Sequence, residues 1–470
     1  MIYEFTIENF RSFGQAQTLN LIKGKEQKKP DNLISGPDGF PKVVKTAAIF
    51  GHNASGKSNL FRAVATFIQA VQFSTIGLNP GSPIPGIEPH RLDPQWDGKP
   101  TRFEIVFPMG ARVFRYGFSA LPQAILDEHL EEELKSGNRR TLMRRHAKGA
   151  DNAANVDFSG DEFDKAAREN VPKLTRDNAL VLSCGASLNV PLLRDIYSRI
   201  ATGISCVQFS PFRMIPDPLA EEIQEDAEFR GMLSALLRDA DIGIKGVRVG
   251  QPPEPTLTEI EQLQRQLAPQ YGERAGAVAS QLAAQRSPKT IVSEHERRDG
   301  SSVEFPWSDE SQGTQLFAQL ARIFRQAIRN RSTIFIDEFG ANIHPLLSER
   351  LIELFQDSRN NPNDGAQLVF TTHHSQLMTP ALFRKDQIWI VEKSSEGQTE
   401  LFSLADFRAD KYTRSSEPFE KHYLNGRYGG VGSFGPTLAG SPLCPAERPD
   451  NHRDQAGIGG GTTGESGSGP

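Results

Sequence analysis

Apolar residues stand at regular intervals among polar neighbours at the start of the chain. Ile2, Phe5 and Ile7 follow the pattern of a half-buried strand. A turn is expected at residues 9–14, and a second strand is expected across 18–22. The chain is therefore predicted to begin with two strands that are joined by a turn.

Two further pairs of apolar segments have the pattern of β-hairpins. The pairs are 102–107 with 112–118, and 291–295 with 302–305. The two strands of each pair are joined by a short segment that contains glycine, which tolerates tight turns. Each pair is expected to form two antiparallel strands.

Between about 125 and 300 the pattern becomes that of amphipathic helices. It is clearest at 191–197 and 229–237, and a Gln/Ala-rich helical stretch across 256–285 is broken at Pro269. No heptad pattern persists long enough to predict an extended coiled coil. This part of the chain is expected to be a mostly helical insertion.

The segment 51–58 matches the phosphate-binding pattern G-x-x-x-x-G-K-[ST] at every fixed position. A buried strand is predicted before it at 43–50, and a helix is predicted after it, to about Phe73. Strand, glycine loop and helix form the context in which this pattern binds nucleotide phosphates. The candidate nucleotide-binding residues are Gly51, Asn53, Ala54, Ser55, Gly56, Lys57, Ser58 and Asn59.

The residue types in this loop fit the chemistry of phosphate binding. Gly51 and Gly56 let the backbone curl so that its N–H groups point at phosphate oxygens. Lys57 would reach the β- and γ-phosphates, and Ser58 would hold Mg²⁺. The alternative is a chance glycine-rich turn.

A second buried strand, at 332–336, ends in Asp337 and Glu338. After a phosphate-binding loop this is the Walker B pattern. Asp337 would hold the Mg²⁺ shell, and Glu338 would be the catalytic residue that orients the attacking water. The alternative is an acidic strand end in a loop.

A third strand, predicted at 366–372, ends in His373 and His374. A histidine beside a phosphate site can bond the γ-phosphate and respond to its loss, so His373 is a second candidate catalytic residue. The alternatives are a metal-binding pair or a plain surface histidine. Adjacent side chains on a strand point to opposite faces, which disfavours a shared metal ion.

Ser311 and Gly313 open a helix predicted across 316–329. A helix N-terminus presents N–H groups to an anion, and Ser311 adds a hydroxyl. On these residues alone an ordinary N-cap is the better interpretation.

The composition is ordinary for a soluble globular protein: 470 residues, 37% hydrophobic and 24% charged, with a net charge of −5. Cys184, Cys206 and Cys444 form no CxxC pair, which disfavours a zinc site and suits a reducing compartment. Neither a signal peptide nor an apolar stretch long enough to span a bilayer is recognised, so a cytoplasmic protein without membrane association is expected.

The order of these motifs resembles the ABC-type ATPase heads of the SMC, RecF and OLD group. In particular it resembles the prokaryotic "AAA domain, putative abortive-infection" ATPases of phage-defence and restriction-associated loci. The segments that carry the resemblance are 7–13, 51–58, 309–315, 337–345, 370–373, 387–393 and 423–429. The chain departs from the family pattern in its signature motif, in Gly340-Ala341-Asn342, and at His374, where the family more often has Asp.

The resemblance implies an α/β fold: a P-loop NTPase of ABC-ATPase-head type with a mixed central sheet, an antiparallel β subdomain and a mostly helical insertion. The expected parts are an N-terminal ATPase lobe (1–125), the insertion (126–300), a C-terminal ATPase lobe (301–430) and a disordered Gly/Pro/Ser-rich tail (431–470).

The resemblance also implies function. The expected activity is Mg²⁺-dependent ATP hydrolysis by a head-to-head homodimer that acts as a nucleotide-gated switch in anti-phage defence. ATP would lie between the phosphate-binding loop of one protomer and Ser311 and Gly313 of the other, with Arg11 near the phosphates. A separate effector, such as a Toprim-like nuclease, would be the partner.

The main alternative is a DNA-repair or chromosome-maintenance ATPase of the RecF or SMC kind, which needs a basic surface. The best candidate cluster consists of Arg139, Arg140, Arg144, Arg145, His146 and Lys148, although such runs are more often solvated faces. A transporter subunit is disfavoured by the signature motif. A P-loop kinase is disfavoured by Glu338 and His373.

Overall fold

A six-stranded sheet lies at the centre of the fold, in the order β11-β15-β16-β5-β17-β18. Its first five strands are parallel, and β18 pairs with β17 in the antiparallel direction. The strands are β5 (Thr46–Phe50), β11 (Ile204–Val207), β15 (Thr333–Ile336), β16 (Gln367–Thr371), β17 (Ile388–Lys393) and β18 (Thr399–Ser403). The strands predicted at 332–336 and 366–372 are therefore confirmed as members of one sheet, and so is the part of the predicted strand 43–50 that forms β5. Its first residues, Val43–Val44, form β4 in a separate two-stranded sheet.

The parallel strands are apolar on both faces because each face is covered by helices. In β16, Val369 packs into one hydrophobic core, whereas Leu368 and Phe370 pack into another. The strand β5 divides in the same way, with Ile49 on the first side and Phe50 on the second. Burial on both faces explains why these strands read as continuous apolar runs in the sequence.

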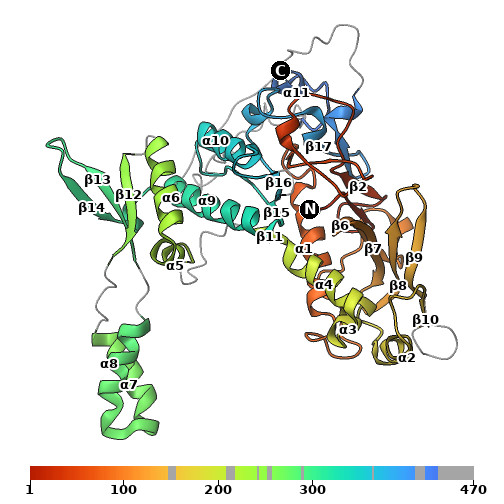
Figure 1. Ribbon diagram of the computed structural model, residues 1–470, viewed down its shortest axis with the longest axis horizontal. Coiled ribbons are helices and arrows are strands. Elements are labelled where there is room, and N and C mark those ends of the chain that lie inside the picture. Colours follow the sequence, from red (N-terminus) through yellow and green to blue (C-terminus); the bar gives the residue numbers. More distant parts are fainter. Residues whose placement is uncertain are drawn as a thin grey trace, which may run out of the picture. The chain divides into compact units, whose positions relative to one another are not determined.

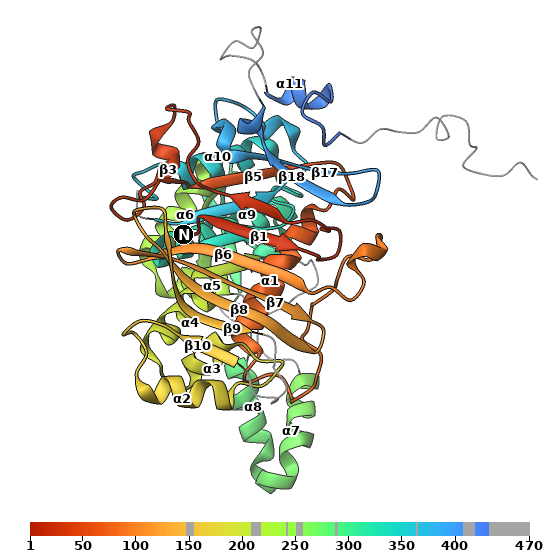
Figure 2. The same cartoon turned by 90° about the vertical axis from the view of Figure 1, so that its right-hand side faces the viewer.

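A seven-stranded antiparallel sheet, in the order β10-β9-β8-β7-β6-β1-β2, forms the second layer. Figure 2 shows β1, β6, β7, β8 and β9 in succession across this sheet. The strands are β1 (Glu4–Glu8), β2 (Gln17–Asn20), β6 (Thr101–Met109), β7 (Arg112–Leu121), β8 (Ala124–Glu133), β9 (Arg139–His146) and β10 (Asn155–Phe158). The predicted pairs at 1–22 and at 102–118 are confirmed.

Helix α1 (Lys57–Phe73) lies between the two sheets and contacts both. Phe67 stacks on Phe118 of β7 with a ring-centroid distance of 5.8 Å, and Phe61 meets Phe335 of β15 edge-on at 5.6 Å. The helix that follows the phosphate-binding loop is thus fixed from two sides.

The expectation of a mostly helical segment from residue 126 is wrong for its first part. Strands β8, β9 and β10 occupy 124–158 and extend the antiparallel sheet. Two positions on these strands that point away from solvent carry charged residues, Glu128 and Arg145, which are 0% and 1% exposed. These buried charges remove the apolar alternation that identifies a strand.

The rest of the insertion is largely helical, as expected (Figure 1). Its helices are α2 (Lys165–Leu174), α3 (Val181–Ser187), α4 (Pro191–Gly203), α5 (Pro218–Glu225), α6 (Ala227–Asp239), α7 (Leu257–Tyr271) and α8 (Ala275–Arg286). Pro269 lies inside α7, and the break falls at Gly272–Arg274 instead. A small sheet of β12 (Ile244–Val249), β13 (Ile291–Glu296) and β14 (Ser302–Pro306) contains the second predicted hairpin.

The second face of the central sheet is covered by α9 (Gln312–Asn330) and α10 (Pro345–Gln356). Phe324 of α9 stacks on Phe339 at 6.1 Å and meets Phe355 of α10 edge-on at 4.9 Å. Smaller elements complete the fold: β3 (Leu33–Ile34) pairs with β4 (Val43–Val44), and α11 (Phe419–Leu424) follows the sheet.

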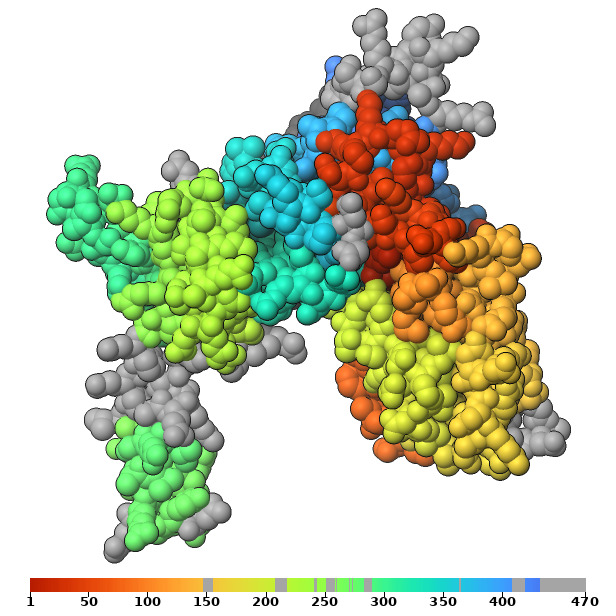
Figure 3. All heavy atoms as spheres, viewed as in Figure 1, coloured from red at the N-terminus to blue at the C-terminus, as the bar shows by residue number. Residues whose placement is uncertain are grey.

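The computed structural model describes residues 1–146, 155–207, 218–240, 243–250, 257–286, 290–362, 365–407 and 419–431. These residues belong to the unit Met1–Val431. The predicted tail at 431–470 lies, except for Val431, outside the described residues. Figure 3 shows the first residues of the chain packed beside its C-terminal third, where the Gln367 side chain donates to the carbonyl oxygens of Ile2 and Val44. No helix among the described residues is long and apolar enough to cross a membrane.

Candidate functional site

Three parallel strands bring the predicted motifs together at the carboxyl-terminal end of the central sheet. β15, β16 and β5 are adjacent, and all run in the same direction. β5 leads into the phosphate-binding loop, β16 leads to His373, and β15 leads to Asp337. The carboxyl ends of parallel strands are where α/β sheets bind ligands.

The phosphate-binding loop is held tightly against β17 and β18. A Cβ atom at Gly51 would lie 2.4 Å from the carbonyl oxygen of Val391, and one at Gly56 would lie 2.2 Å from Oγ1 of Thr399. Gly56 also has a φ of +115° and precedes the first residue of α1. The space and the backbone conformation both require glycine there, as expected for a loop whose N–H groups turn inward.

The Lys57 ammonium lies over this loop and within electrostatic reach of the Walker B acids. Its Nζ donates to the carbonyl oxygens of Gly51 at 2.6 Å and His52 at 2.9 Å. Burial lowers the pKa of Lys57 to about 8, while the charges of Asp337 and Glu338 act in the opposite direction. The structure thus brings together Lys57 and both acids, which the sequence assigned to one site.

The remaining loop residues differ in exposure. Asn53 and Ala54 are exposed, Ser58 and Asn59 are half-buried, and Ser55 is fully buried. The Ser55 Oγ has no hydrogen-bond partner within the described part of the chain. A buried hydroxyl of this kind in a phosphate-binding loop is free to donate to a ligand oxygen.

Sequence reasoning missed Ser12 and Thr399, two hydroxyl residues that brace the loop from behind. Thr399 Oγ1 donates to the carbonyl oxygen of Ser55 at 2.9 Å and shares a 2.8 Å hydrogen bond with Ser12 Oγ, which also accepts from Asn59 Nδ2 at 2.8 Å. Ser12 lies in the predicted turn at 9–14, but no local pattern marks Thr399.

Arg11 points elsewhere. Its guanidinium forms a 2.7 Å ion pair with Glu88, and its backbone has a φ of +50°. The turn does reach the phosphate-binding loop, but it does so through Ser12. In this structure the Arg11 guanidinium is paired with Glu88, and the expected place of Arg11 near the phosphates stays a prediction.

Thr371, at the end of β16, organises the Walker B residues. Its Oγ1 donates to Oδ1 of Asp337 at 2.6 Å and accepts from the backbone N–H of Glu338 at 2.7 Å. Asp337 is half-buried, whereas the Glu338 side chain is exposed and its backbone has a φ of +56°. One carboxylate is therefore fixed near the loop, and the other remains free to act on solvent.

The two histidines after β16 have different surroundings. His373 is exposed, and its pKa is lowered by burial of part of the ring and by the positive charge of Lys57. The Nδ1 atom of His374 is buried, and within the described residues it has no hydrogen-bond partner. The described residues contain no group of three or more His, Cys, Asp or Glu that could hold a metal ion.

The Ser311 hydroxyl caps α9 and accepts from the backbone N–H of Thr314 at 3.1 Å. The N-cap interpretation is thus confirmed. Gly313 lies against the segment after Walker B, since a Cβ atom there would lie 2.6 Å from the carbonyl oxygen of Asn342. The signature and the residues that follow Glu338 are therefore in direct contact within one protomer.

The basic cluster on β9 is not a free positive surface. Arg139 pairs with Glu131 and Glu133, Arg140 pairs with Glu132 and Glu162, and Arg144 pairs with Asp127. Arg145 is buried and donates to backbone carbonyl oxygens, while Lys148 lies outside the described residues.

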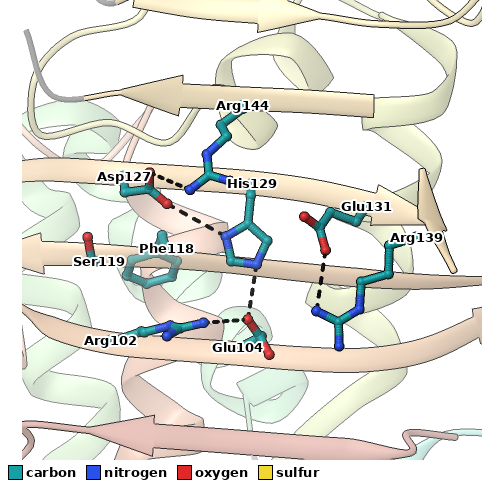
Figure 4. Close-up of a pocket in the computed structure, with 9 residues that line it drawn as sticks. All are labelled: Arg102, Glu104, Phe118, Ser119, Asp127, His129, Glu131, Arg139 and Arg144. Atoms are coloured by element: carbon teal, nitrogen blue, oxygen red, sulfur yellow. Dashed lines mark hydrogen bonds and ion pairs between the residues drawn. The ribbon is translucent and has the colours of Figure 1, made fainter. Parts of the chain in front are cut away.

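Figure 4 shows a hollow beside this cluster, and Arg139 and Arg144 are among the residues that line it. It has a volume of about 400 Å³. His129 lies at its centre between Glu104 and Asp127, and its Nε2 is 3.1 Å from Oε2 of Glu104. Opposite charges are matched here, so the cluster does not support the nucleic-acid alternative.

Comparison with known proteins identifies the family to which this chain belongs. No curated protein matches the chain. Among solved structures, the chain is similar to the SMC head domain from Thermotoga maritima, with 13% identity over 86% of this chain and 98% of that chain and a TM-score of 0.38. It is also similar to the recombination mediator protein RecF with ATP, with 13% identity over 85% and 97% of the two chains and a TM-score of 0.30.

Both TM-scores lie below 0.5, so the assignment rests on the family model and on the strand order described above. The model described as "AAA domain, putative AbiEii toxin, Type IV TA system" matches residues 47–379. This range begins in β5 and includes the phosphate-binding loop, Walker B and both histidines. The chain belongs to this family of AAA domains, and its fold is an α/β P-loop fold built on a mostly parallel central sheet.

Proposed function

We propose that this protein binds and hydrolyses ATP with Mg²⁺. The observation that carries the proposal is that Lys57, Asp337, Glu338 and His373 follow three adjacent parallel strands, which bring them to the same end of the sheet. A phosphate-binding loop with a buried lysine, two acids and a histidine is the set that nucleotide hydrolysis needs.

The residues fit the groups they would hold. The loop leaves no space for a side chain at Gly51 or Gly56, and the unpartnered Ser55 hydroxyl is available as a donor. Ser58 and Asp337 would hold Mg²⁺, which when bound neutralises charge on the β- and γ-phosphate oxygens. Lys57 would exchange its two backbone carbonyl contacts for phosphate oxygens.

Glu338 is the group assigned to the attacking water. Its exposed carboxylate can orient the water and accept its proton, while Thr371 fixes the Glu338 backbone. His373 would donate to the γ-phosphate and lose that contact after hydrolysis. Its pKa is lowered, which favours the neutral ring with one N–H donor.

The nucleotide is further proposed to gate a dimer, with the Ser311 end of α9 from a second copy completing the site. The support is the sequence resemblance and the exposure of Ser311. The role in anti-phage defence with a separate effector is supported by the resemblance and by the toxin–antitoxin system in the family description.

The test compares wild type with Glu338→Gln, which keeps the size of the side chain but removes its charge. Turnover in the variant should fall by about 10²–10⁴-fold, while ATP binding should persist. Glu353→Gln, at an exposed position on α10, is the matched control and should hydrolyse ATP like wild type. Wild-type turnover in Glu338→Gln would remove Glu338 from the catalytic role.

Light scattering of Glu338→Gln with and without Mg²⁺-ATP tests the dimer. A doubled mass with nucleotide that is lost in the additional Ser311→Arg variant is the expected result. An unchanged monomer would contradict the composite site and leave hydrolysis to be judged by the turnover assay alone.

A further inference from the structure

Two buried polar atoms face the same glycine behind the Walker B residues. Ser348 of α10 is fully buried, and the Nδ1 atom of His374 is buried as well. Neither Ser348 Oγ nor His374 Nδ1 has a hydrogen-bond partner among the residues that the structure describes. A Cβ atom at residue 340 would lie 2.9 Å from the first atom and 3.1 Å from the second.

This arrangement is unusual because buried side-chain polar atoms nearly always have a partner. A hydroxyl and an imidazole nitrogen are complementary, since the hydroxyl can donate to a neutral nitrogen or accept from its N–H. Gly340 has a φ of +86°, so its backbone favours glycine and leaves the point near both atoms free of a side chain. Both atoms therefore face the same unfilled point beside Gly340, and a movement of either side chain toward that point would bring them closer together.

The turn at Gly340 connects the candidate catalytic residue to the signature. Two consecutive turns cover 338–343, because Ala341 N–H donates to the carbonyl oxygen of Glu338 and Ile343 N–H donates to that of Gly340. The same segment carries Asn342, whose carbonyl oxygen lies against Gly313. A conformational change at Gly340 would therefore move the Glu338 backbone and also the segment that contacts Gly313 of the signature.

His374 is well placed to control this turn. Its backbone N–H donates to Thr372 Oγ1 at 3.1 Å, and its ring follows directly after His373. Since His373 is the residue assigned to the γ-phosphate, a movement of His373 on nucleotide binding would be transmitted to the His374 ring.

We propose that His374 is a positioning residue of the ATPase site, whose Nδ1 hydrogen-bonds to Ser348 Oγ when the 338–343 turn closes on bound nucleotide. The bond sets the Glu338 backbone and the Asn342 contact with Gly313 at the same time. This inference rests on the proposed ATPase function and adds a residue to it.

The test measures kcat, KM and ATP affinity for Ser348→Ala, His374→Ala and the double variant. Each single change should lower kcat about tenfold and leave ATP affinity within about twofold, because neither side chain is assigned to the nucleotide. The double variant should be no slower than the slower single variant. His374→Asn, which keeps a polar atom near the Nδ1 position, should recover most of the rate.

The matched control is Ser183→Ala, a buried serine on α3 that hydrogen-bonds to the carbonyl oxygen of Val71 near the far end of α1. It should leave kcat unchanged. Additive effects of the two changes on kcat in the double variant, or a wild-type kcat in both single variants, would overturn this inference but not the proposed ATPase function. A wild-type protein without ATPase activity would overturn the proposed function and the inference together.

A direct measurement does not depend on the folding of any variant. The ¹⁵N resonance of His374 Nδ1 in wild type should shift when Mg²⁺ and a non-hydrolysable ATP analogue are added. Normal binding of the analogue without such a shift would overturn the inference.

Discussion

The Thr371 hydroxyl donates a 2.6 Å hydrogen bond to Oδ1 of Asp337. The same hydroxyl oxygen accepts from the backbone N–H of Glu338. One side chain on β16 thereby fixes the direction of the acid that would hold Mg²⁺ and the backbone of the acid assigned to water. β16 contributes to the site through this hydroxyl as well as through His373.

Replacement of Thr371 by valine keeps the branched shape but removes both hydrogen bonds. We expect a stability loss of about 1–3 kcal/mol, the range for leaving a buried polar group unpaired, and a larger proportional fall in kcat than change in KM. Thermal unfolding and steady-state ATPase assays measure the two effects. Thr175→Val, which loses one buried hydrogen bond to the carbonyl oxygen of Val171, is the control and should lower stability without changing kcat. Equal kcat values for the two variants would contradict the role given to Thr371.

ATP affinity should depend on the ionisation of Lys57. The pKa of its ammonium is about 8 in the unliganded protein, and a neutral amine cannot pair with phosphate. Raising the pH from 7 to 9 should therefore weaken binding by about tenfold. Calorimetric titrations at a series of pH values would follow this loss.

Lys57→Ala should abolish tight ATP binding and, with it, the dependence on pH. Lys165→Ala, at an exposed position on α2, should retain both the affinity and the pH profile of wild type. Normal ATP affinity in a folded Lys57→Ala protein would disprove the phosphate-binding assignment.

Glu128 should be important for stability although it lies far along the sheet from the site. Its carboxylate accepts from the backbone N–H groups of Val181 and Leu182 and from the Tyr116 hydroxyl. Burial raises the pKa of Glu128, while Arg145 and the hydrogen bonds act in the opposite direction. Glu128→Ala should cost about 3–5 kcal/mol, as when one partner of a buried charged network is removed.

Urea unfolding checks this value. Glu169→Ala, at an exposed position on α2, should change the free energy of unfolding by less than about 0.5 kcal/mol. If Glu128→Ala lowers the free energy of unfolding by no more than the control does, the backbone N–H groups at the N-terminus of α3 must find other hydrogen-bond acceptors.

The pH dependence of stability should contain a contribution from His129. Burial lowers the pKa of this ring, but Asp127 and Glu104 outweigh burial and raise the pKa above its usual value. The folded protein therefore binds the proton more tightly than the unfolded chain does. The resulting stabilisation is complete below the unfolded pKa, near 6.5, and is lost as the pH rises through the higher folded pKa.

His129→Gln removes the ionisable group and should be destabilised relative to wild type by more at pH 5.5 than at pH 9. Glu104 remains ionised over this range because its pKa is lowered. The pH dependence of the His129–Glu104 ion pair therefore comes from the ionisation of His129. Thermal unfolding of both proteins at the two pH values gives the comparison. A constant difference in melting temperature would rule out the ionisation of His129 as the cause.

The phosphate-binding loop, Walker B and the strand before His373 could be predicted because their signals are local. Each combines a short apolar run with polar residues at a fixed spacing, and the parallel strands bury both faces. Ser12 and Thr399 could not be found in this way. They meet behind the loop through a hydrogen bond across 387 residues. Ser12 lies in a predicted turn, but nothing in that turn indicates its distant partner, and no local pattern marks Thr399.

The strands at 124–158 were missed for a different physical reason. Glu128 occupies an inward position because it caps the N-terminus of α3, and Arg145 does so because it satisfies carbonyl oxygens before that helix. Glutamate and leucine also have high helix propensity, so the local sequence of β8 favours the wrong element. Long-range capping of one element by another overrides local preference here.

The strand order of the central sheet also has a consequence for synthesis of the chain. β5 emerges from the ribosome before its neighbours β16 and β17, which are made only after the helical insertion, and the Gln367 side chain bonds to the carbonyl oxygen of Val44 across 323 residues. The nucleotide-binding loop therefore stays without its supporting strands until β16 and β17 have been made. Nascent chains stalled before residue 367 should be unable to retain nucleotide and should depend on chaperones to shield the apolar β5 and α1.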